Sequence, residues 1–282
     1  MTNSLEKLQE QIPDLKTANE NNEILIHAFY KPTGKNKKKP VKINGKSHST
    51  FWQKQADLKK IAKYKNLGLN IGADPEKKGQ HLGVLDIDGF KKQPKGDKKN
   101  YWYDWDYHKL SCKLLFDVLK DIDIDFIPEM TWSGGFHLFF ISKEQIDNDL
   151  SVLKYIKYPS DWKIKELQDK GITETKKTLE VITKKNVKIF MTSPSYWYEE
   201  KLNPKTNKPE RKDGHYNFIN PPEKNLIRDL KPVEDIKTKL LDVFLKHGFT
   251  YDKEEHQKAL QNQKTNEISH QPVKILVKLN QR

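Results

Sequence analysis

The most regular feature of the chain is a series of short apolar runs separated by polar stretches that contain glycine, proline or lysine. Apolar runs of about four to eight residues, or alternation of apolar and polar residues, are typical of strands. Two pairs of such runs predict hairpins, one turning at 133–135 and the other at 184–186. The predicted strands lie at 24–30, 66–72, 81–88, 126–132, 136–141, 179–182 and 187–192.

Apolar residues at helical spacing predict helices in four other segments. In residues 1–22 only the beginning is helical, because Leu5, Leu8 and Ile12 are followed by polar sequence. The other predicted helices lie at 51–65, 110–120 and 224–247.

The remaining segments are predicted to be loops. They include a lysine-rich loop after Tyr30, a polar and aromatic insertion at 91–109, and a charged loop at 199–214. Beyond Tyr251 the sequence is mostly polar, so no further core element is expected there.

This mixture of strands, hairpins and helices predicts an α+β fold with largely antiparallel sheets. The length of 282 residues fits one large domain or two small ones. We assign residues 1–222 to a main domain, with an N-terminal α/β part at 1–80 and the site-bearing part at 81–222. Residues 223–282 are expected to form a helical segment and a polar tail, which would be a short helical end or a linker to a further domain.

The composition is strongly basic, with 52 Lys and Arg against 39 Asp and Glu and a net charge of +13. A polyanionic partner would explain this excess, since lysine neutralises phosphates regardless of sequence. A lysine-rich surface that reflects genome composition would explain it equally well. The charge alone therefore does not establish binding to nucleic acid.

Cysteine usage and hydrophobicity narrow the class of protein. A single cysteine, Cys112, excludes an internal disulfide and a cysteine-based zinc cluster. No apolar run approaches the roughly 18 residues that cross a bilayer, and the first residues lack the apolar core of a signal peptide. We therefore expect a cytoplasmic protein without a membrane partner.

Two acids close the apolar strand predicted at 81–88. Side chains on a strand repeat every two residues, so Asp86 and Asp88 point to one face, while Leu85 and Ile87 point to the other. Neighbouring carboxylates repel each other, and a divalent cation resolves the conflict. The sequence thus indicates a metal site, although two solvated acids at a strand end would have the same pattern.

A second motif combines Ser133, Gly134, Gly135 and His137 at the predicted hairpin. The glycines permit a positive φ and close approach of a ligand, and their N–H groups can surround an anion. The serine hydroxyl and the imidazole add polar groups that can contact phosphate. A plain hairpin with a structural histidine is the alternative, but the combination after an acid pair favours a functional site.

A third acid, Glu180, alternates with apolar residues in the strand predicted at 179–182. It is far from Asp88 in the chain, so only the fold can bring the two together. The next predicted strand ends near Ser193 and Ser195, whose hydroxyls are candidates for contact with a nucleotide. By themselves these features are also typical of an exposed acid and ordinary turn residues.

The order of these motifs resembles the primase–polymerase family of the archaeo-eukaryotic primase superfamily. The resemblance covers roughly residues 24–196. Further upstream, Lys39-Pro40-Val41, Trp52 and Asn70-Ile71-Gly72 are similar to the N-terminal signature of that family. The third acid is often aspartate in the family but is Glu180 here, and the cysteines of a zinc-binding stem are missing.

The resemblance implies a fold and a set of roles. The fold would be an RNA-recognition-motif-like catalytic sheet joined to an N-terminal α/β unit, in a primase-like core. Asp86, Asp88 and Glu180 would hold two Mg²⁺ or Mn²⁺ ions, and His137 with Ser133 would hold the triphosphate of an NTP or dNTP. The basic residue that often follows the third acid would be Lys184 or Lys185.

The same resemblance implies a template-dependent DNA primase or polymerase of a plasmid, viral or prokaryotic type. Its partners would be single-stranded DNA template, primer, nucleoside triphosphates and a helicase domain or subunit. The insertion after the acid pair interleaves basic and aromatic residues as single-strand binding requires, with Lys98, Lys99, Tyr101 and Trp102 as candidates. A solvated insertion whose aromatic residues pack on the core would have the same composition. A metal-dependent nuclease and a non-catalytic single-strand binding module are the competing functions.

Overall fold

The computed structural model describes residues 4–11, 26–30, 40–41, 63–72, 79–88, 105–145, 156–157, 179–182, 189–203, 206, 208–219, 229–254 and 257–258. These residues form a mixed α/β structure with antiparallel sheets and three helices, compatible with the predicted α+β class. The predicted lysine-rich loop, most of the predicted helix at 51–65 and most of the insertion at 91–109 lie outside the described residues.

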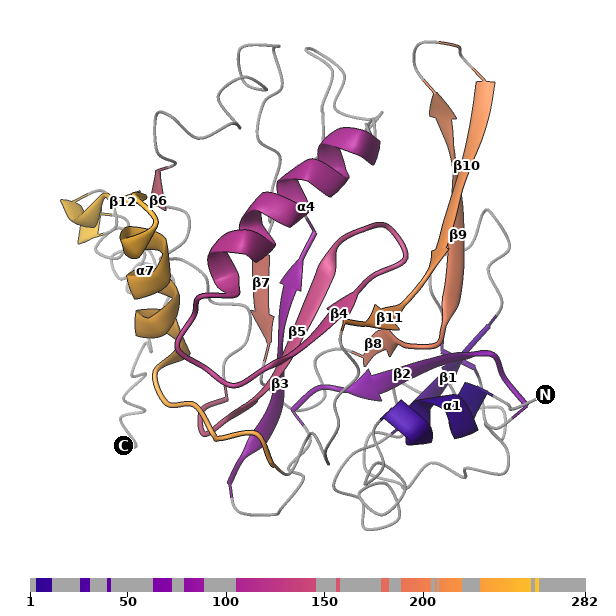
Figure 1. Cartoon of the computed structure of the whole chain (residues 1–282), viewed down its shortest axis with the longest axis horizontal. Coiled ribbons are helices and arrows are strands. Elements are labelled where there is room, and N and C mark those ends of the chain that lie inside the picture. The colour runs from indigo at the N-terminus through magenta and orange to yellow at the C-terminus, as the bar shows by residue number, and fades with distance from the viewer. Residues whose placement is uncertain are drawn as a thin grey trace, which may run out of the picture.

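A five-stranded antiparallel sheet in the order β11-β4-β5-β3-β7 forms the centre of the fold (Figure 1). Strands β4 and β5 form the hairpin predicted around Gly134, and β3 lies between β5 and β7. The strands are β3 (His81–Ile87), β4 (Ile127–Met130), β5 (Phe136–Ser142), β7 (Leu179–Ile182) and β11 (Asn217–Phe218).

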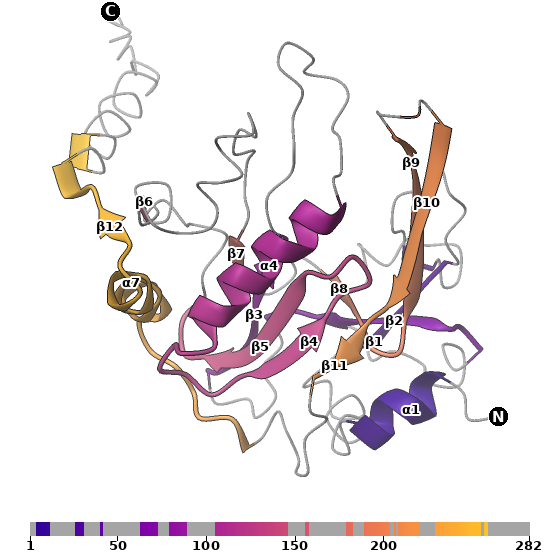
Figure 2. The same ribbon diagram turned by 45° about the horizontal axis from the view of Figure 1, so that its top comes forward.

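A three-stranded antiparallel sheet, β1-β2-β8, lies beside the central sheet (Figure 2). Its strands are β1 (Ile26–Phe29), β2 (Asn66–Asn70) and β8 (Ile189–Thr192). Helix α1 (Ser4–Gln11) buries Leu5 and Leu8 in an apolar cluster that also contains side chains of these three strands. The predictions of a short N-terminal helix and of strands in 24–30 and 66–72 are confirmed.

Two apolar clusters cover the two faces of the central sheet, because side chains alternate along each strand. Leu82 and Val84 of β3 join the cluster that is shared with the three-stranded sheet. Leu85 and Ile87 point the opposite way, into the cluster that is shared with helices. Asp86 therefore belongs to the face that meets the smaller sheet.

Helices α4 (Trp105–Leu119) and α7 (Ile236–Lys246) contribute apolar side chains to the cluster that contains Leu85 and Ile87 (Figure 2). α7 begins after Asp235, whose side chain accepts a hydrogen bond from the backbone N–H of Thr238 and caps the helix. Residues 233–249 thus pack with the body of the fold. No helix among the described residues is long and apolar enough to cross a membrane.

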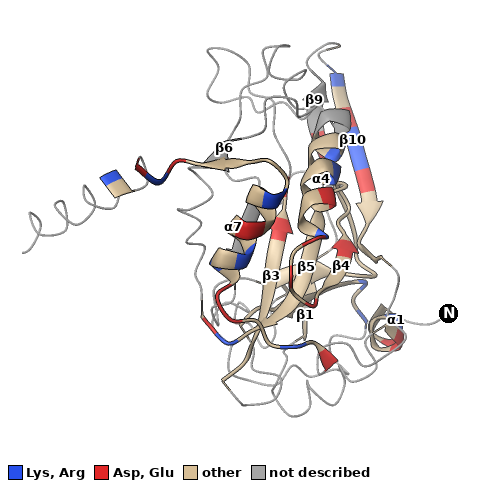
Figure 3. Ribbon diagram, turned by 60° about the vertical axis from the view of Figure 1, so that its left-hand side comes forward, with Lys and Arg blue, Asp and Glu red and all other residues tan. Residues whose placement is uncertain are grey.

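Strands β9 (Tyr196–Asn203) and β10 (Lys208–His215) form a two-stranded ribbon that extends from the body of the molecule (Figures 1 and 3). Gly214 anchors the base of the ribbon, since a Cβ there would lie 2.4 Å from the carbonyl oxygen of Trp132. A smaller pair joins β6 (Ile156–Lys157) to β12 (Thr250–Tyr251).

The structure corrects one predicted hairpin. The strands predicted at 179–182 and 187–192 exist as β7 and β8 but do not pair with each other: β7 pairs with β3, and β8 pairs with β2. Each strand instead forms the edge of a different sheet. The sequence at 184–186, where the turn was predicted, also lacks the glycine that tight hairpins favour.

The prediction of a charged loop at 199–214 is also wrong, because residues 199–203 and 208–214 belong to the β9–β10 ribbon. Charged side chains line the ribbon, shown as blue and red segments of β10 in Figure 3, so its sequence lacks the apolar alternation of a half-buried strand. The helix predicted at 224–247 is shorter, because α7 begins at Ile236 and Val233 instead bridges to Ser142.

Candidate functional site

The strand register brings four polar positions into one row across the central sheet. Glu129 of β4 is paired with His137 of β5, and His137 is paired with Asp86 of β3. On the other side of β3, the backbone of Glu180 in β7 lies opposite that of Asp86. Three predicted site residues from separate parts of the sequence therefore occupy neighbouring positions, together with one that was not predicted.

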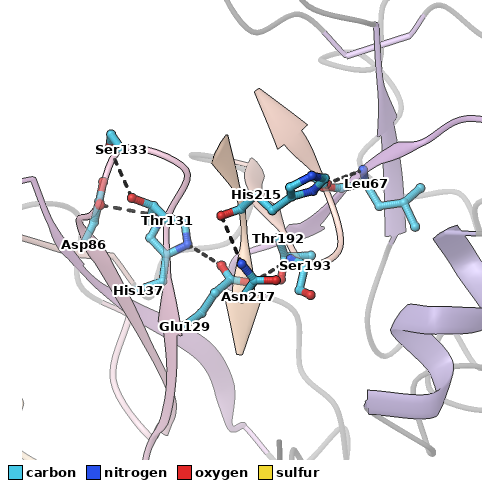
Figure 4. Close-up of polar contacts among 11 residues, drawn as sticks. Leu67, Asp86, Glu129, Thr131, Ser133, His137, Thr192, Ser193, His215 and Asn217 are labelled. Atoms are coloured by element: carbon cyan, nitrogen blue, oxygen red, sulfur yellow. Dashed lines mark hydrogen bonds and ion pairs between the residues drawn. The ribbon is translucent and has the colours of Figure 1, made fainter. Parts of the chain in front are cut away.

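The imidazole of His137 lies between two carboxylates (Figure 4). Its Nδ1 is 2.8 Å from Oε2 of Glu129, and its Nε2 is 3.7 Å from Oδ1 of Asp86. Exposure falls along this line, from 17% for the Asp86 side chain to 6% for His137 and 0% for Glu129. The solvent-accessible end of the row is thus the aspartate.

Aromatic rings fix the plane of this imidazole. The ring of Tyr216 lies against it with centroids 5.8 Å apart, while Phe139 and Phe190 meet it edge-on. Phe190 belongs to β8, so the histidine is held at the junction of the two sheets. Such packing leaves the ring little freedom to rotate.

Glu129 is the residue of this site that the sequence analysis missed. Its Oε1 accepts hydrogen bonds from the hydroxyl of Thr192 and the backbone N–H of Ser193, each at 2.6 Å. With His137 on Oε2, this fully buried carboxylate has partners on both oxygens. The hairpin register contained the information, since a turn centred on Ser133 places 129 opposite 137.

The turn of the hairpin is shaped by its two glycines. The backbone N–H of Gly134 donates to the carbonyl of Thr131, and Gly134 has a φ of 84°, which favours glycine. A Cβ on Gly135 would lie 2.5 Å from the carbonyl oxygen of Ile87, so glycine allows the turn to pack against the end of β3. The Ser133 and Thr131 hydroxyls are 3.2 Å apart.

Lys109 of α4 extends over this turn. A Cβ on Gly134 would lie 2.7 Å from Cγ of Lys109 and 3.4 Å from its Cε. The aliphatic part of the lysine therefore covers the glycine, and a positive charge is carried to the Ser-Gly-Gly turn. No pattern in the sequence identifies this lysine, because α4 and the hairpin meet only in the folded chain.

The two predicted serines near the end of β8 are engaged inside the protein. The hydroxyl of Ser193 donates to Oε1 of Gln11, and the side chain of Ser195 bonds to both backbone groups of Leu67. Both serines are buried. In this structure their hydroxyls join β8 to α1 and β2 and are not directed to the row of acids.

The electrostatic effect of the acids reaches Tyr216. Burial raises the pKa of its hydroxyl well above the ordinary value, and the carboxylates of Glu129, Asp86, Asp88 and Glu199 raise that pKa further. The site is thus a region of concentrated negative charge, and cations are the ligands that such a region favours.

Asp121, Asp123 and Asp125 follow α4 at the same alternate spacing as Asp86 and Asp88, but each of them has a structural partner. Oδ2 of Asp121 is 3.0 Å from Nε2 of His247, and Oδ2 of Asp123 is 2.5 Å from Nζ of Lys239. Asp125 accepts from the backbone N–H of Lys231. These aspartates join the end of α4 to α7 and to the segment before it, which accounts for their place in the sequence.

Several predicted residues cannot be placed. Lys98, Lys99, Tyr101, Trp102, Lys184 and Lys185 lie outside the described residues, and of Glu180 the structure describes the backbone alone. Among the side chains that are described, no group of three or more His, Cys, Asp or Glu is arranged to hold a metal ion. The carboxylates of Asp86, in this row, and of the half-buried Asp88, directly after β3, are ligands of the type that Mg²⁺ and Mn²⁺ prefer.

No protein-family model matches the chain, and no curated protein matches it either. Its class is therefore defined by the fold and the site: an α+β protein with a buried glutamate–histidine pair next to aspartates at the end of a central strand.

Proposed function

We propose that this protein is a template-dependent nucleotidyltransferase of the primase–polymerase type, which makes or extends primers on single-stranded DNA. The observation that carries the proposal is the register of three strands, in which His137, Asp86 and Glu180 occupy neighbouring positions. These residues were selected from the sequence as the phosphate-binding and metal-binding groups of that family. Their convergence in the fold is what such an assignment requires.

The arrangement of the sheet supports the same proposal. Strand β3 is followed by α4, then by β4 and β5, and later by β7, and in space β3 lies between β5 and β7. One helix between the first two strands, with the first strand in the interior of an antiparallel sheet, suits the RNA-recognition-motif-like sheet expected from the resemblance. The site lies on the sheet face opposite α4.

In this proposal the carboxylates of Asp86, Asp88 and Glu180 hold two Mg²⁺ or Mn²⁺ ions. When bound, the ions activate the primer hydroxyl and neutralise the triphosphate and the leaving pyrophosphate. The residues of the chain supply orientation and fixed charge, since phosphoryl transfer depends mainly on positioning and electrostatic stabilisation.

The triphosphate would bind between the Ser-Gly-Gly turn and His137. Nε2 of His137 faces Asp86 across 3.7 Å, which places the ring edge next to the proposed metal ligands. Ser133 is half-buried at the turn, and Lys109 brings a cation to Gly134. Lys109 thus joins Lys184 and Lys185 as a candidate to neutralise the triphosphate, while Lys98, Lys99, Tyr101 and Trp102 remain the candidates for template binding.

The decisive experiment is synthesis on a single-stranded DNA template with labelled NTPs or dNTPs, with and without a primer, in Mg²⁺ or Mn²⁺. Asp86→Ala should reduce synthesis by more than about 100-fold, because loss of a mere supporting residue around a metal costs about 10–100-fold. Asp242→Ala is the matched control, since Asp242 is exposed on α7 and should leave synthesis unchanged.

The outcomes separate the proposed function from its competitors. Metal-dependent degradation of DNA without added nucleotides would identify a nuclease instead. Binding of single-stranded DNA without synthesis or metal-dependent nucleotide binding would identify a non-catalytic module. Synthesis at the normal rate by Asp86→Ala would show that the site has been assigned to the wrong residues.

A further inference from the structure

The fully buried carboxylate of Glu129 has no part in the proposed metal or triphosphate site, yet it contacts the histidine of that site. Burying a carboxylate is costly unless hydrogen bonds compensate it. Here Oε1 accepts from Thr192 and from the backbone N–H of Ser193, and Oε2 lies 2.8 Å from Nδ1 of His137. The donors come from β5, from β8 and from Ser193 directly after β8, so the carboxylate joins the two sheets behind the histidine.

We propose that Glu129 is a positioning residue, which keeps a hydrogen on Nδ1 of His137 and directs Nε2 toward Asp86. An ionised carboxylate only accepts hydrogen bonds, so Nδ1 must donate to Oε2. The opposite ring nitrogen then faces Oδ1 of Asp86 at 3.7 Å, which is too long for a direct hydrogen bond. Histidines at metal sites are oriented by carboxylates in the same manner.

The role of this contact in catalysis rests on the proposed nucleotidyltransferase function, but the contact can be tested without it. In Glu129→Gln, the amide oxygen must stay where Ser193 and Thr192 donate to it, because the backbone N–H of Ser193 can only donate a hydrogen bond. The amide NH₂ then faces Nδ1, which must accept, so Nδ1 loses its hydrogen. The substitution therefore changes the state of Nδ1 while the volume of the side chain stays nearly constant.

The experiment is ¹⁵N NMR of histidine-labelled protein, with His137 assigned by comparison with His137→Gln. The wild type should have hydrogen on Nδ1, and Nδ1 should lack hydrogen in Glu129→Gln. Thr192→Val is the matched control, because it removes one donor to Oε1 and leaves the contact of Oε2 with His137 in place. This control should keep the hydrogen on Nδ1.

Synthesis assays with the same variants test the catalytic role. Glu129→Gln should lower kcat/KM by about 10–100-fold, the usual effect of removing an outer residue that orients a site, and Thr192→Val should stay near the wild-type value. An Nδ1 without hydrogen in the wild type, or an Nδ1 with hydrogen in a folded Glu129→Gln protein, would overturn the assignment. If Glu129→Gln does not fold, the spectra of the wild type and of Thr192→Val still test whether Nδ1 of His137 carries a hydrogen.

Two further results remain distinct. Loss of the hydrogen on Nδ1 in Glu129→Gln as expected, with a wild-type protein that synthesises nothing, would refute the nucleotidyltransferase function and leave the positioning of His137 intact. The same loss with full synthesis by Glu129→Gln would refute the catalytic role of Glu129.

Discussion

Replacing Ser195 with alanine should destabilise the protein and leave its affinity for nucleotides unchanged. The side chain of Ser195 accepts from the backbone N–H of Leu67 at 2.8 Å and donates to the backbone carbonyl of Leu67 at 2.9 Å. Both residues are fully buried, so water cannot replace the lost hydroxyl. The prediction thus distinguishes a structural serine from the nucleotide contact that the sequence motif indicates.

The magnitude follows from the two backbone groups that would lose their partner. A buried donor or acceptor left unsatisfied costs about 1–3 kcal/mol, so two such groups cost about 2–6 kcal/mol. The variant no longer buries a hydroxyl, which offsets part of that cost, and we expect a net loss of about 2–4 kcal/mol. At about 2–4 °C per kcal/mol for a protein of roughly this size, Tm should fall by about 4–16 °C.

Thermal or urea unfolding measures the loss, and synthesis at varied nucleotide concentrations measures the KM. Ser133→Ala is the matched comparison, because Ser133 is half-buried and its hydroxyl is 3.2 Å from that of Thr131. It should change stability by less than about 1 kcal/mol, within the net worth of one hydrogen bond, and raise the KM. A Ser195→Ala protein with normal stability and a raised KM would refute this reasoning.

Two other predictions concern the surroundings of the site. Lys109→Ala should raise the nucleotide KM about tenfold or more, since a hydrogen bond to a charged group contributes about 1.5–3 kcal/mol; Lys113→Ala, one turn along α4, is the control, and equal KM values would exclude a role for Lys109. Tyr216 should make the protein less stable above about pH 10, because its pKa is raised by burial and the unfolded chain releases the phenolic proton first. The free energy of unfolding, measured from about pH 9 to 11.5, should fall less steeply in Tyr216→Phe, and parallel curves would contradict the prediction.

Local patterns in the sequence were sufficient for most strands and for the geometry of single motifs. Alternation alone predicts that the side chains of Asp86 and Leu85 point to opposite faces of the sheet, because the side-chain period of a strand is set by the backbone. The Ser-Gly-Gly turn was likewise predictable, since glycine permits the positive φ of Gly134.

Pairing between distant strands was not predictable in the same way. The pattern in 179–182 and 187–192 is equally suited to one hairpin or to two separate edges, and the structure places the strands in two sheets. The β9–β10 ribbon was missed because hydrogen bonds between its strands hold it together without an apolar face of its own along most of its length.

The sequence by itself determined most of the strand-forming segments, the opposite directions of Asp86 and Leu85 and the presence of a glycine turn before His137, because these depend on neighbouring residues. Only the tertiary structure decided that Glu180 lies opposite Asp86, that Glu129 lies behind His137, and that Ser195 bonds to β2. The physical reason is that strand register and burial are set by contacts between segments far apart in the chain, which satisfy each other's backbone and polar groups in ways that no single segment specifies.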